Sequence, residues 1–161
     1  IPLPKVLEDQ DHGYGNLQID KLNPPVNGSI DSFTTTLNIT FFDPIFLSID
    51  KISGYITIYK TSDNSIRQKI SPTMNDFCKI SLDGKTLYIN VINSVFNQFG
   101  ESYYVQMDNN FVKSKFYNEP LKGIGDGIWI LTSSIKNNVI TDNSSDSAIV
   151  GIAGIKKDAK E

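Results

Sequence analysis

Cysteine, histidine and arginine are almost absent from the sequence, which holds one of each among its 161 residues. A single cysteine excludes a disulfide within the chain, and one cysteine with one histidine excludes the usual four-ligand Cys/His zinc site. Lysine and arginine number 15 against 18 aspartates and glutamates, which gives a formal net charge of −3. This balance argues against a nucleic-acid partner and against a polybasic membrane-binding surface. No run of about 18 apolar residues occurs, so we expect no membrane insertion within this segment.

The residues that are present favour β-strands. Isoleucine and the aromatic residues suit pleated, half-buried surfaces, and the frequent asparagine, aspartate, glycine and serine suit turns. Alanine, leucine and glutamate, which build long helices, are too few. In residues 34–42, Leu37, Ile39 and Phe41 occupy every second position, and this period of two places them on one inward face of a strand.

About seven to nine short strands, separated by turn signals, are predicted between residues 17 and 133. The pattern predicts an all-β fold, an Ig-like antiparallel β-sandwich, and a small closed barrel is the alternative. Asp83–Gly84 is expected to form a tight primed hairpin turn with two positive φ angles. Residues 93–100 are expected to hold one short helical turn.

Composition divides the chain into three parts. Residues 1–16 are expected to form a loose N-terminal segment, residues 17–133 the Ig-like sandwich, and residues 134–161 a polar linker or tail. Within the tail, residues 148–155 are small and apolar, and we interpret them as an added strand or as the remnant of a junction. Because the first residue is Ile1, we expect the chain to be a processed or excised piece.

The two residues with the most reactive side chains are assigned ordinary roles. A Ser-His-Asp or Cys-His catalytic pair would have to use His12, but His12 lies in the loose segment, so we expect it to be exposed to solvent. Cys78 lies at a strand start. A reactive thiol or an intermolecular disulfide is the functional alternative for Cys78, and a small buried residue is the favoured interpretation. No catalytic residue, cofactor or metal ligand is assigned.

Carboxylates and amides are plentiful in the predicted turns. The turn aspartates are Asp43, Asp50, Asp63, Asp76, Asp83 and Asp108. A pair of carboxylates could hydrolyse glycosides, yet aspartate is a common turn residue and the sequence brings no two of them together. Residues 108–110 and 142–146 offer oxygen atoms to calcium, but without the spacing of an EF-hand.

Three Asn-x-Ser/Thr sequons begin at Asn27, Asn38 and Asn143. In a eukaryotic secreted protein these asparagines are candidate glycosylation sites. Because Leu37 and Ile39 are predicted to face inward, Asn38 is expected to face outward, as a glycan requires.

Tyr103 and Tyr104 are neighbours in a predicted strand, so one ring must lie on each face. One ring is expected in the core and the other on the surface. There an exposed aromatic could contact a protein or a glycan, although such a ring more often only covers the sheet. Trp129, in the last strong strand, is expected to pack between the sheets.

Five short motifs occur in an order typical of one family of bacterial Ig-like domains. They are a turn with proline and glycine at 23–28, a strand ending in Phe-x-x-Pro at 37–45, a glycine leading into a strand at 54–58, a Tyr-Tyr-Val strand with an acidic turn at 103–108, and a final strand with tryptophan at 129–132. Together they resemble the SbsA-type Ig-like family first described in S-layer proteins. The resemblance implies a cell-surface or extracellular module used for spacing, assembly or adhesion, and it implies no catalytic residue. Surface proteins of eukaryotic microbes also have this lysine- and asparagine-rich character.

These observations predict a non-catalytic Ig-like module, secreted or on the cell surface, for adhesion, assembly or spacing. Its expected partners are proteins or glycans at the cell surface, and exposed strand edges make self-association a further candidate. The alternative is a carbohydrate-active enzyme or its accessory carbohydrate-binding module. Two convergent carboxylates in a cleft would favour the enzyme, and a flat surface would favour the module. A third interpretation is an intracellular structural protein, with which the lone cysteine is compatible.

Overall fold

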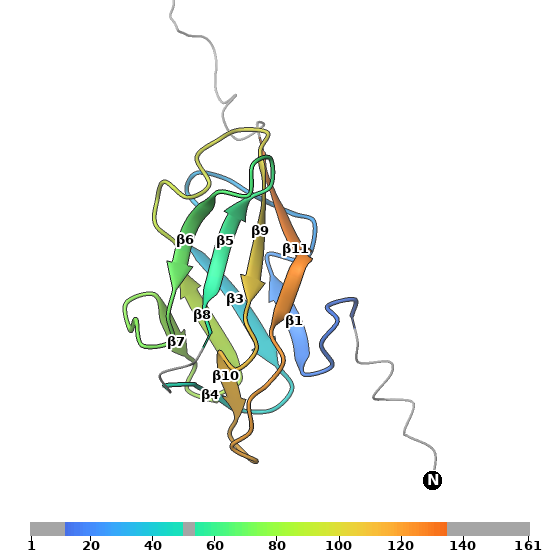
Figure 1. Cartoon of the computed structure of the whole chain (residues 1–161), viewed down its shortest axis with the longest axis vertical. Coiled ribbons are helices and arrows are strands. Elements are labelled where there is room, and N and C mark those ends of the chain that lie inside the picture. The colour runs from blue at the N-terminus through green and yellow to red at the C-terminus, as the bar shows by residue number, and fades with distance from the viewer. Residues whose placement is uncertain (1–11, 50–53, 135–161) are drawn as a thin grey trace, which may run out of the picture.

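The computed structural model describes residues 12–49 and 54–134, which form an all-β structure (Figure 1). These ranges contain no helix, and so none that is long and apolar enough to cross a membrane. The eleven strands in these ranges are β1 (Ile19–Asn23), β2 (Gly28–Ile30), β3 (Thr36–Phe41), β4 (Ile45–Leu47), β5 (Ile56–Lys60), β6 (Ile66–Ile70), β7 (Cys78–Ile80), β8 (Thr86–Asn90), β9 (Ser102–Met107), β10 (Val112–Ser114) and β11 (Ile124–Ser133).

The strands form two principal sheets that face each other. One sheet has the order β1-β3-β8-β7 and the other the order β2-β11-β9-β5-β6, while β10 and β4 pair at one end of the molecule (Figure 1). Among the described strands, β2 and β11 are parallel and every other pair is antiparallel. Each principal sheet has two edge strands, so the sheets do not close into a barrel. The predicted antiparallel β-sandwich is confirmed.

Strand β3 shows how the sequence pattern builds the core. Leu37, Ile39 and Phe41 are buried between the sheets, whereas Asn38 and Thr40 are only partly buried on the outer face. Burying a large aliphatic or aromatic side chain stabilises a fold by roughly 1.5–3 kcal/mol. The alternation in β3 therefore fixes which face of the four-stranded sheet packs inward.

Trp129 on β11 and Tyr103 on β9 are the largest fully buried side chains. The indole Nε1 of Trp129 donates a hydrogen bond to the carbonyl oxygen of Pro24 at 2.8 Å. The ring of Tyr103 meets that of Phe96 edge-on, with centroids 5.1 Å apart, and its hydroxyl accepts a hydrogen bond from the Gln98 amide at 3.2 Å. The prediction that Trp129 packs between the sheets is confirmed, and both polar atoms have partners, as buried aromatic residues require.

Two strands of three residues were not predicted. Strand β2 pairs in parallel with residues 131–133 of β11, and β4 pairs with residues 112–114 of β10. Both strands exist because of a partner far along the chain. Three residues are too few to show a period of two in the sequence, so the local sequence does not predict β2 or β4.

The turn between β7 and β8 differs from the predicted primed turn. Gly84 has a φ of +79°, but Asp83 does not have a positive φ, so the expectation of two positive angles is wrong. The amide of Ser81 donates to the carbonyl of Thr86 at 2.9 Å and closes a wider loop. The carboxylate of Asp83 accepts hydrogen bonds from the Ser81 hydroxyl at 2.6 Å and the Lys85 amide at 3.0 Å. These bonds hold Asp83 in an ordinary turn conformation.

Residues 93–100 form turns, one of them closed by a hydrogen bond from the Val95 amide to the Ile92 carbonyl at 3.0 Å, and no helix is assigned to them. Val95 and Phe96 are buried. The guanidinium of Arg67 on β6 donates hydrogen bonds to the carbonyl oxygens of Val95 at 3.1 Å and Ser94 at 2.8 Å. Carbonyl groups that a helix would pair with its own amides thus bind a side chain from the neighbouring sheet.

Candidate functional site

His12 lies on the surface, and its predicted exposure is confirmed, with 45% of the side chain accessible. Its Nε2 lies 4.0 Å from the Asp20 Oδ1, and its ring contacts those of Tyr14 and Phe42. These partners are a surface carboxylate and two aromatic rings, so His12 makes side-chain contacts on the protein surface.

Cys78 is a free, buried cysteine, as the favoured interpretation predicted. Its thiol donates a hydrogen bond to the carbonyl oxygen of Met74 at 3.4 Å. Burial raises the pKa of the Cys78 thiol above its ordinary value. Because the thiolate is the nucleophilic form, burial and the raised pKa both reduce the reactivity of this residue.

We expect Cys78 to resist alkylation in the folded protein. Labelling by iodoacetamide at pH ~8 should be at least about 100-fold slower than in the urea-unfolded chain, since the thiol must first be exposed by an opening of the core. Mass spectrometry at timed intervals gives both rates, and the unfolded chain is the control for intrinsic reactivity. Equal rates in the two states would contradict the burial of Cys78.

Two of the turn aspartates, Asp63 and Asp83, accept hydrogen bonds within their own turns. Hydrogen bonds from Ser65 hold the pKa of Asp63 below its usual value, and a hydrogen bond from the Ser81 hydroxyl is the main cause of the lowered pKa of Asp83. A catalytic general acid needs the opposite, a raised pKa. In residues 12–49 and 54–134, no three His, Cys, Asp or Glu side chains lie close enough together to hold a metal ion.

The sequon asparagines occupy different surroundings. Asn27 is exposed with a φ of +62°, and its amide donates to the carbonyl of Ile130 at 2.8 Å. Asn38 is half-buried on the outer face of the four-stranded sheet, paired with Tyr88 of β8. Glycosylation at either asparagine stays a prediction. Outside the described residues lie Asn143, Asp50 and residues 142–146.

Tyr103 and Tyr104 face opposite sides of β9, as predicted. Tyr103 is fully buried in the core, so it is not available to a partner. Tyr104 lies partly exposed on the outer face of the five-stranded sheet. A contact role for Tyr104 stays a prediction, and it depends on which side chains lie beside Tyr104 on the same face of the sheet.

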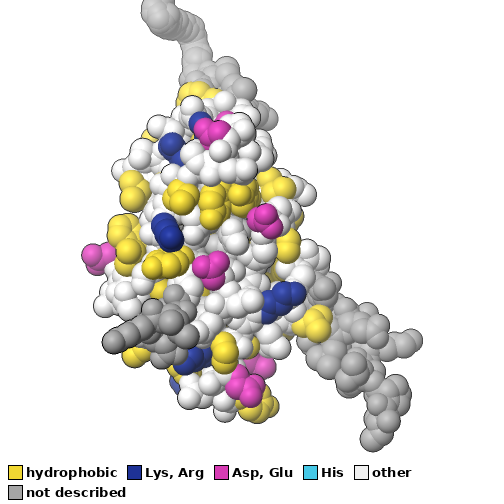
Figure 2. All heavy atoms as spheres, in the orientation of Figure 1, with side chains coloured by type: hydrophobic (Ala, Val, Ile, Leu, Met, Phe, Trp, Pro, Cys, Tyr) yellow, Lys and Arg dark blue, Asp and Glu magenta, His cyan; other side chains and the backbone are white. Residues whose placement is uncertain are grey.

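A row of large side chains crosses the outer face of the five-stranded sheet. The strand register places Tyr59 of β5 between Ile66 of β6 and Tyr104 of β9, and it places Tyr104 beside Ile130 of β11. We call these four side chains the aromatic row. Figure 2 shows hydrophobic side chains as a band across this face of the molecule. Ile66 is exposed and the other three are partly exposed, so the row presents a continuous apolar surface to solvent.

The two tyrosines of the aromatic row stack on each other. Their ring centroids lie 4.8 Å apart and their planes differ by 17°, so the rings stand face to face and present their edges outward. The Tyr104 hydroxyl donates a hydrogen bond to the Asn64 side-chain oxygen at 3.1 Å. Desolvation raises the pKa of Tyr104, and the nearby Tyr59 and Asp126 raise it further. The phenol therefore stays neutral and hydrogen-bonding at physiological pH.

The lysines near the aromatic row, Lys60 and Lys69, contact neighbouring side chains. Lys60 Nζ donates to the Gln98 side-chain oxygen at 3.0 Å and lies 3.4 Å from the Asp63 carboxylate. Lys69 Nζ lies 4.3 Å from the centre of the Tyr55 ring. These contacts leave the row bordered by both signs of charge, which favours contact by shape and apolar area over electrostatic attraction.

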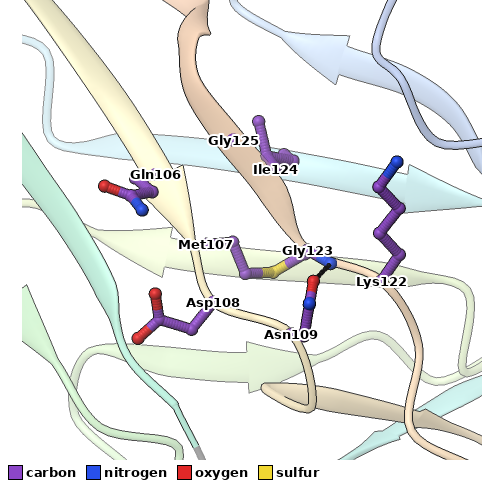
Figure 3. A pocket seen from close by; sticks show the side chains of 8 residues that line it. All are labelled: Gln106, Met107, Asp108, Asn109, Lys122, Gly123, Ile124 and Gly125. Carbon is purple, nitrogen blue, oxygen red and sulfur yellow. Dashed lines mark hydrogen bonds between the residues drawn. The ribbon is translucent and has the colours of Figure 1, made fainter.

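A bulge in β11 opens a small pocket in the same sheet. Ile124 pairs with Met107 and Trp129 with Val105, so the four residues 125–128 lie opposite the single residue Gln106. The interrupted ladder leaves a cavity of about 240 Å³ lined by residues 106–109 and 122–125 (Figure 3). We call it the bulge pocket. It is a concave feature lined by both polar and apolar groups, whereas the side chains of the aromatic row are tyrosines and isoleucines.

Hydrogen bonds fix the walls of the bulge pocket. The Gly123 amide donates to the Asn109 side-chain oxygen at 2.8 Å. The Asn16 amide group donates to the carbonyls of Lys122 at 2.7 Å and Gly123 at 3.1 Å. The carboxylate of Asp108 accepts a hydrogen bond from the amide of Tyr55 at 3.0 Å. The two lining segments, residues 106–109 and 122–125, are therefore held by hydrogen bonds to each other and to Asn16 and Tyr55.

Sequence reasoning found Tyr104 but not the aromatic row or the bulge pocket. Both depend on which strands pair and in what register, and register is set by long-range packing. The glycines at 123, 125 and 127 were the available signal for the pocket, because glycine within a strand often marks a bulge.

Comparison with known proteins gave no match to a family model and no match to a curated protein. Among solved structures, the chain is distantly similar to CopC from Methylosinus trichosporium OB3b, with a TM-score of 0.47 and 10% identity, over 72% of this chain and 91% of that one. It is also distantly similar to the S-layer protein SbsC, in a structure named rSbsC(31-844) and in one of domains 1–6, each with a TM-score of 0.37 and 14% identity over 72% of this chain. The chain spans 13% of the SbsC chains. These distant similarities are between β-sandwich structures, and membership of the SbsA-type Ig-like family stays a prediction.

Proposed function

We propose that this chain is a non-catalytic β-sandwich module of a secreted or cell-surface protein, which contacts a protein or a glycan through the outer face of its five-stranded sheet. The observation that carries the proposal is the aromatic row, in which Ile66, Tyr59, Tyr104 and Ile130 form one apolar line across four strands. Exposed tyrosines on a rigid sheet are typical anchors of contact surfaces, because they bury much area at little cost in conformational entropy.

The surroundings of three turn aspartates support a module over an enzyme. Asp63 and Asp83 have lowered pKa values and bind groups of their own turns. Asp108 is held by the Tyr55 amide. An acid catalyst of glycoside hydrolysis would need a carboxyl group with a raised pKa beside a second carboxylate. The carbohydrate-binding alternative keeps one supporting observation, the bulge pocket, whose lining includes the polar side chains of Gln106, Asp108, Asn109 and Lys122.

The proposal is tested by removing the rings of the aromatic row. We expect fluorescent beads coated with the protein to adhere to cells of the source organism, and the double variant Tyr59→Ser/Tyr104→Ser to adhere at least about tenfold less, since central aromatic residues each contribute 1–2 kcal/mol or more to a contact. Bead retention under flow gives the measurement.

Tyr88→Ser is the matched control, because Tyr88 is an exposed tyrosine on the outer face of the opposite sheet. It should leave adhesion unchanged. Equal adhesion by the wild type and the double variant, with both folded by circular dichroism, would show that the face carrying the row is not the contact surface.

A further inference from the structure

We infer that the bulge pocket binds one neutral sugar ring, which it holds with the side chains of Gln106, Asp108, Asn109 and Lys122. The inference rests on the proposed function and names the ligand class for this part of the contact face. Its basis is the set of polar groups that the bulge gathers around a cavity of about 240 Å³. No sequence motif or similar protein assigns a site here.

The pocket lining offers hydrogen-bonding capacity that the fold does not use. In the described part of the chain, no hydrogen-bond partner is found for the Gln106 amide or the Lys122 ammonium group. One carboxylate oxygen of Asp108 accepts a hydrogen bond from the Tyr55 amide, and the side-chain oxygen of Asn109 accepts one from the Gly123 amide. The second carboxylate oxygen of Asp108 and the side-chain NH2 group of Asn109 remain available to a ligand. Figure 3 shows Gln106 and Asp108 on one side of the pocket and Lys122 on the other.

The mixture of groups selects a hydroxylated and uncharged ligand. Asp108 only accepts hydrogen bonds, Lys122 only donates them, and the amide of Gln106 does both. A sugar hydroxyl also donates and accepts, so neighbouring hydroxyls of one ring satisfy such a set. In the lining, the Asp108 carboxylate and the Lys122 ammonium group balance in charge, and Asp126 of the bulge, which lies close enough to raise the pKa of Tyr104, adds a negative charge nearby, so the site gives an anion no net attraction.

The size and position of the pocket fit a single ring of a longer glycan. Its volume of about 240 Å³ is below the roughly 300–1,000 Å³ of pockets for drug-sized ligands. Gln106 and Tyr104 lie two residues apart on the same face of β9, about 7 Å from each other along the strand. A sugar ring in the pocket therefore places the next unit of a glycan against Tyr104 and Ile130. The tyrosines offer edges rather than faces, so polar contacts in the pocket provide the recognition.

The inference is tested by titrating the ¹⁵N-labelled protein with the methyl glycosides of glucose, mannose and galactose up to about 50 mM. We expect at least one glycoside to shift the amide resonances of residues 106–109 and 122–125, with a dissociation constant on the order of 1 mM, as ligand efficiency allows for a ligand of this size. Gln106→Ala and Lys122→Met should each weaken binding about 3–10-fold, since each removes one hydrogen bond.

Ser102→Ala is the matched control, because Ser102 lies on the same face of β9, two residues on the other side of Tyr104. It should leave the affinity unchanged. The inference is overturned if no glycoside shifts the pocket resonances, if Gln106→Ala binds as the wild type does, or if the zwitterion glycylglycine shifts them and the glycosides do not. If the Tyr59/Tyr104 double variant loses adhesion but no glycoside shifts the resonances of the pocket residues, the proposed function stands and the sugar site alone is rejected.

Discussion

Replacing Trp129 with alanine is expected to lower the free energy of unfolding by about 3–5 kcal/mol, the largest effect of any single core substitution in this protein. Trp129 is fully buried between the sheets and is the largest residue of the core. Its loss removes the transfer free energy of the indole and leaves a cavity that the surrounding strands fill only in part. Because domains of this size are stable by about 5–15 kcal/mol, the variant would lie near the limit of folding.

A second substitution at the same position separates packing from hydrogen bonding. Trp129→Phe keeps an aromatic ring but removes the donor that binds the Pro24 carbonyl at 2.8 Å, and we expect it to cost about 1–3 kcal/mol. Leu82→Ala is the surface control, because Leu82 is fully exposed at the β7–β8 turn, and it should change stability by less than about 0.5 kcal/mol. Urea unfolding followed by circular dichroism measures all three. An alanine variant as stable as the phenylalanine variant would refute the central packing role of the indole.

The local pattern of the sequence was sufficient for the long strands and for the sandwich. In β3, a period of two over Leu37, Ile39 and Phe41 identified both the strand and its buried face. Trp129 and Cys78 were assigned to the interior from residue type and strand position, and both are buried. These predictions succeed because burial of alternate apolar side chains is the main free energy that forms such a sheet.

The candidate contact face could not be predicted, because it is a product of register. Ile66, Tyr59, Tyr104 and Ile130 come from four strands, and a shift of one residue in any pairing would turn a member of the row into the core. The incorrect turn at Asp83 has a different cause. Asp-Gly permits a primed turn, but hydrogen bonds from Ser81 and Lys85 to the Asp83 carboxylate stabilise another conformation, and the sequence does not rank the two.

Gly123→Ala is the second substitution for which we expect a large effect, a loss of about 3 kcal/mol or more of stability. A Cβ at position 123 would collide with the carbonyl oxygen of Met107 and would lie 2.7 Å from the carbonyl oxygen of Asp108. These are main-chain atoms of β9 and its following turn, so no side-chain rotation relieves the contact. The two segments would have to separate, which would also break the bond from the Gly123 amide to Asn109.

Gly125→Ala, two residues further along the same bulge, is the matched control. The nearest atom to a Cβ at position 125 is the Ile128 Cδ1 at 3.8 Å, an ordinary van der Waals contact. We therefore expect Gly125→Ala to change the free energy of unfolding by no more than about 1 kcal/mol, in either direction. Urea midpoints give the two values, and amide spectra show whether the resonances of Asn109 and Asn16 move in Gly123→Ala alone. Similar stabilities for the two variants would mean that β9 and β11 do not approach each other at residue 123, and the walls of the bulge pocket would then have to be placed differently.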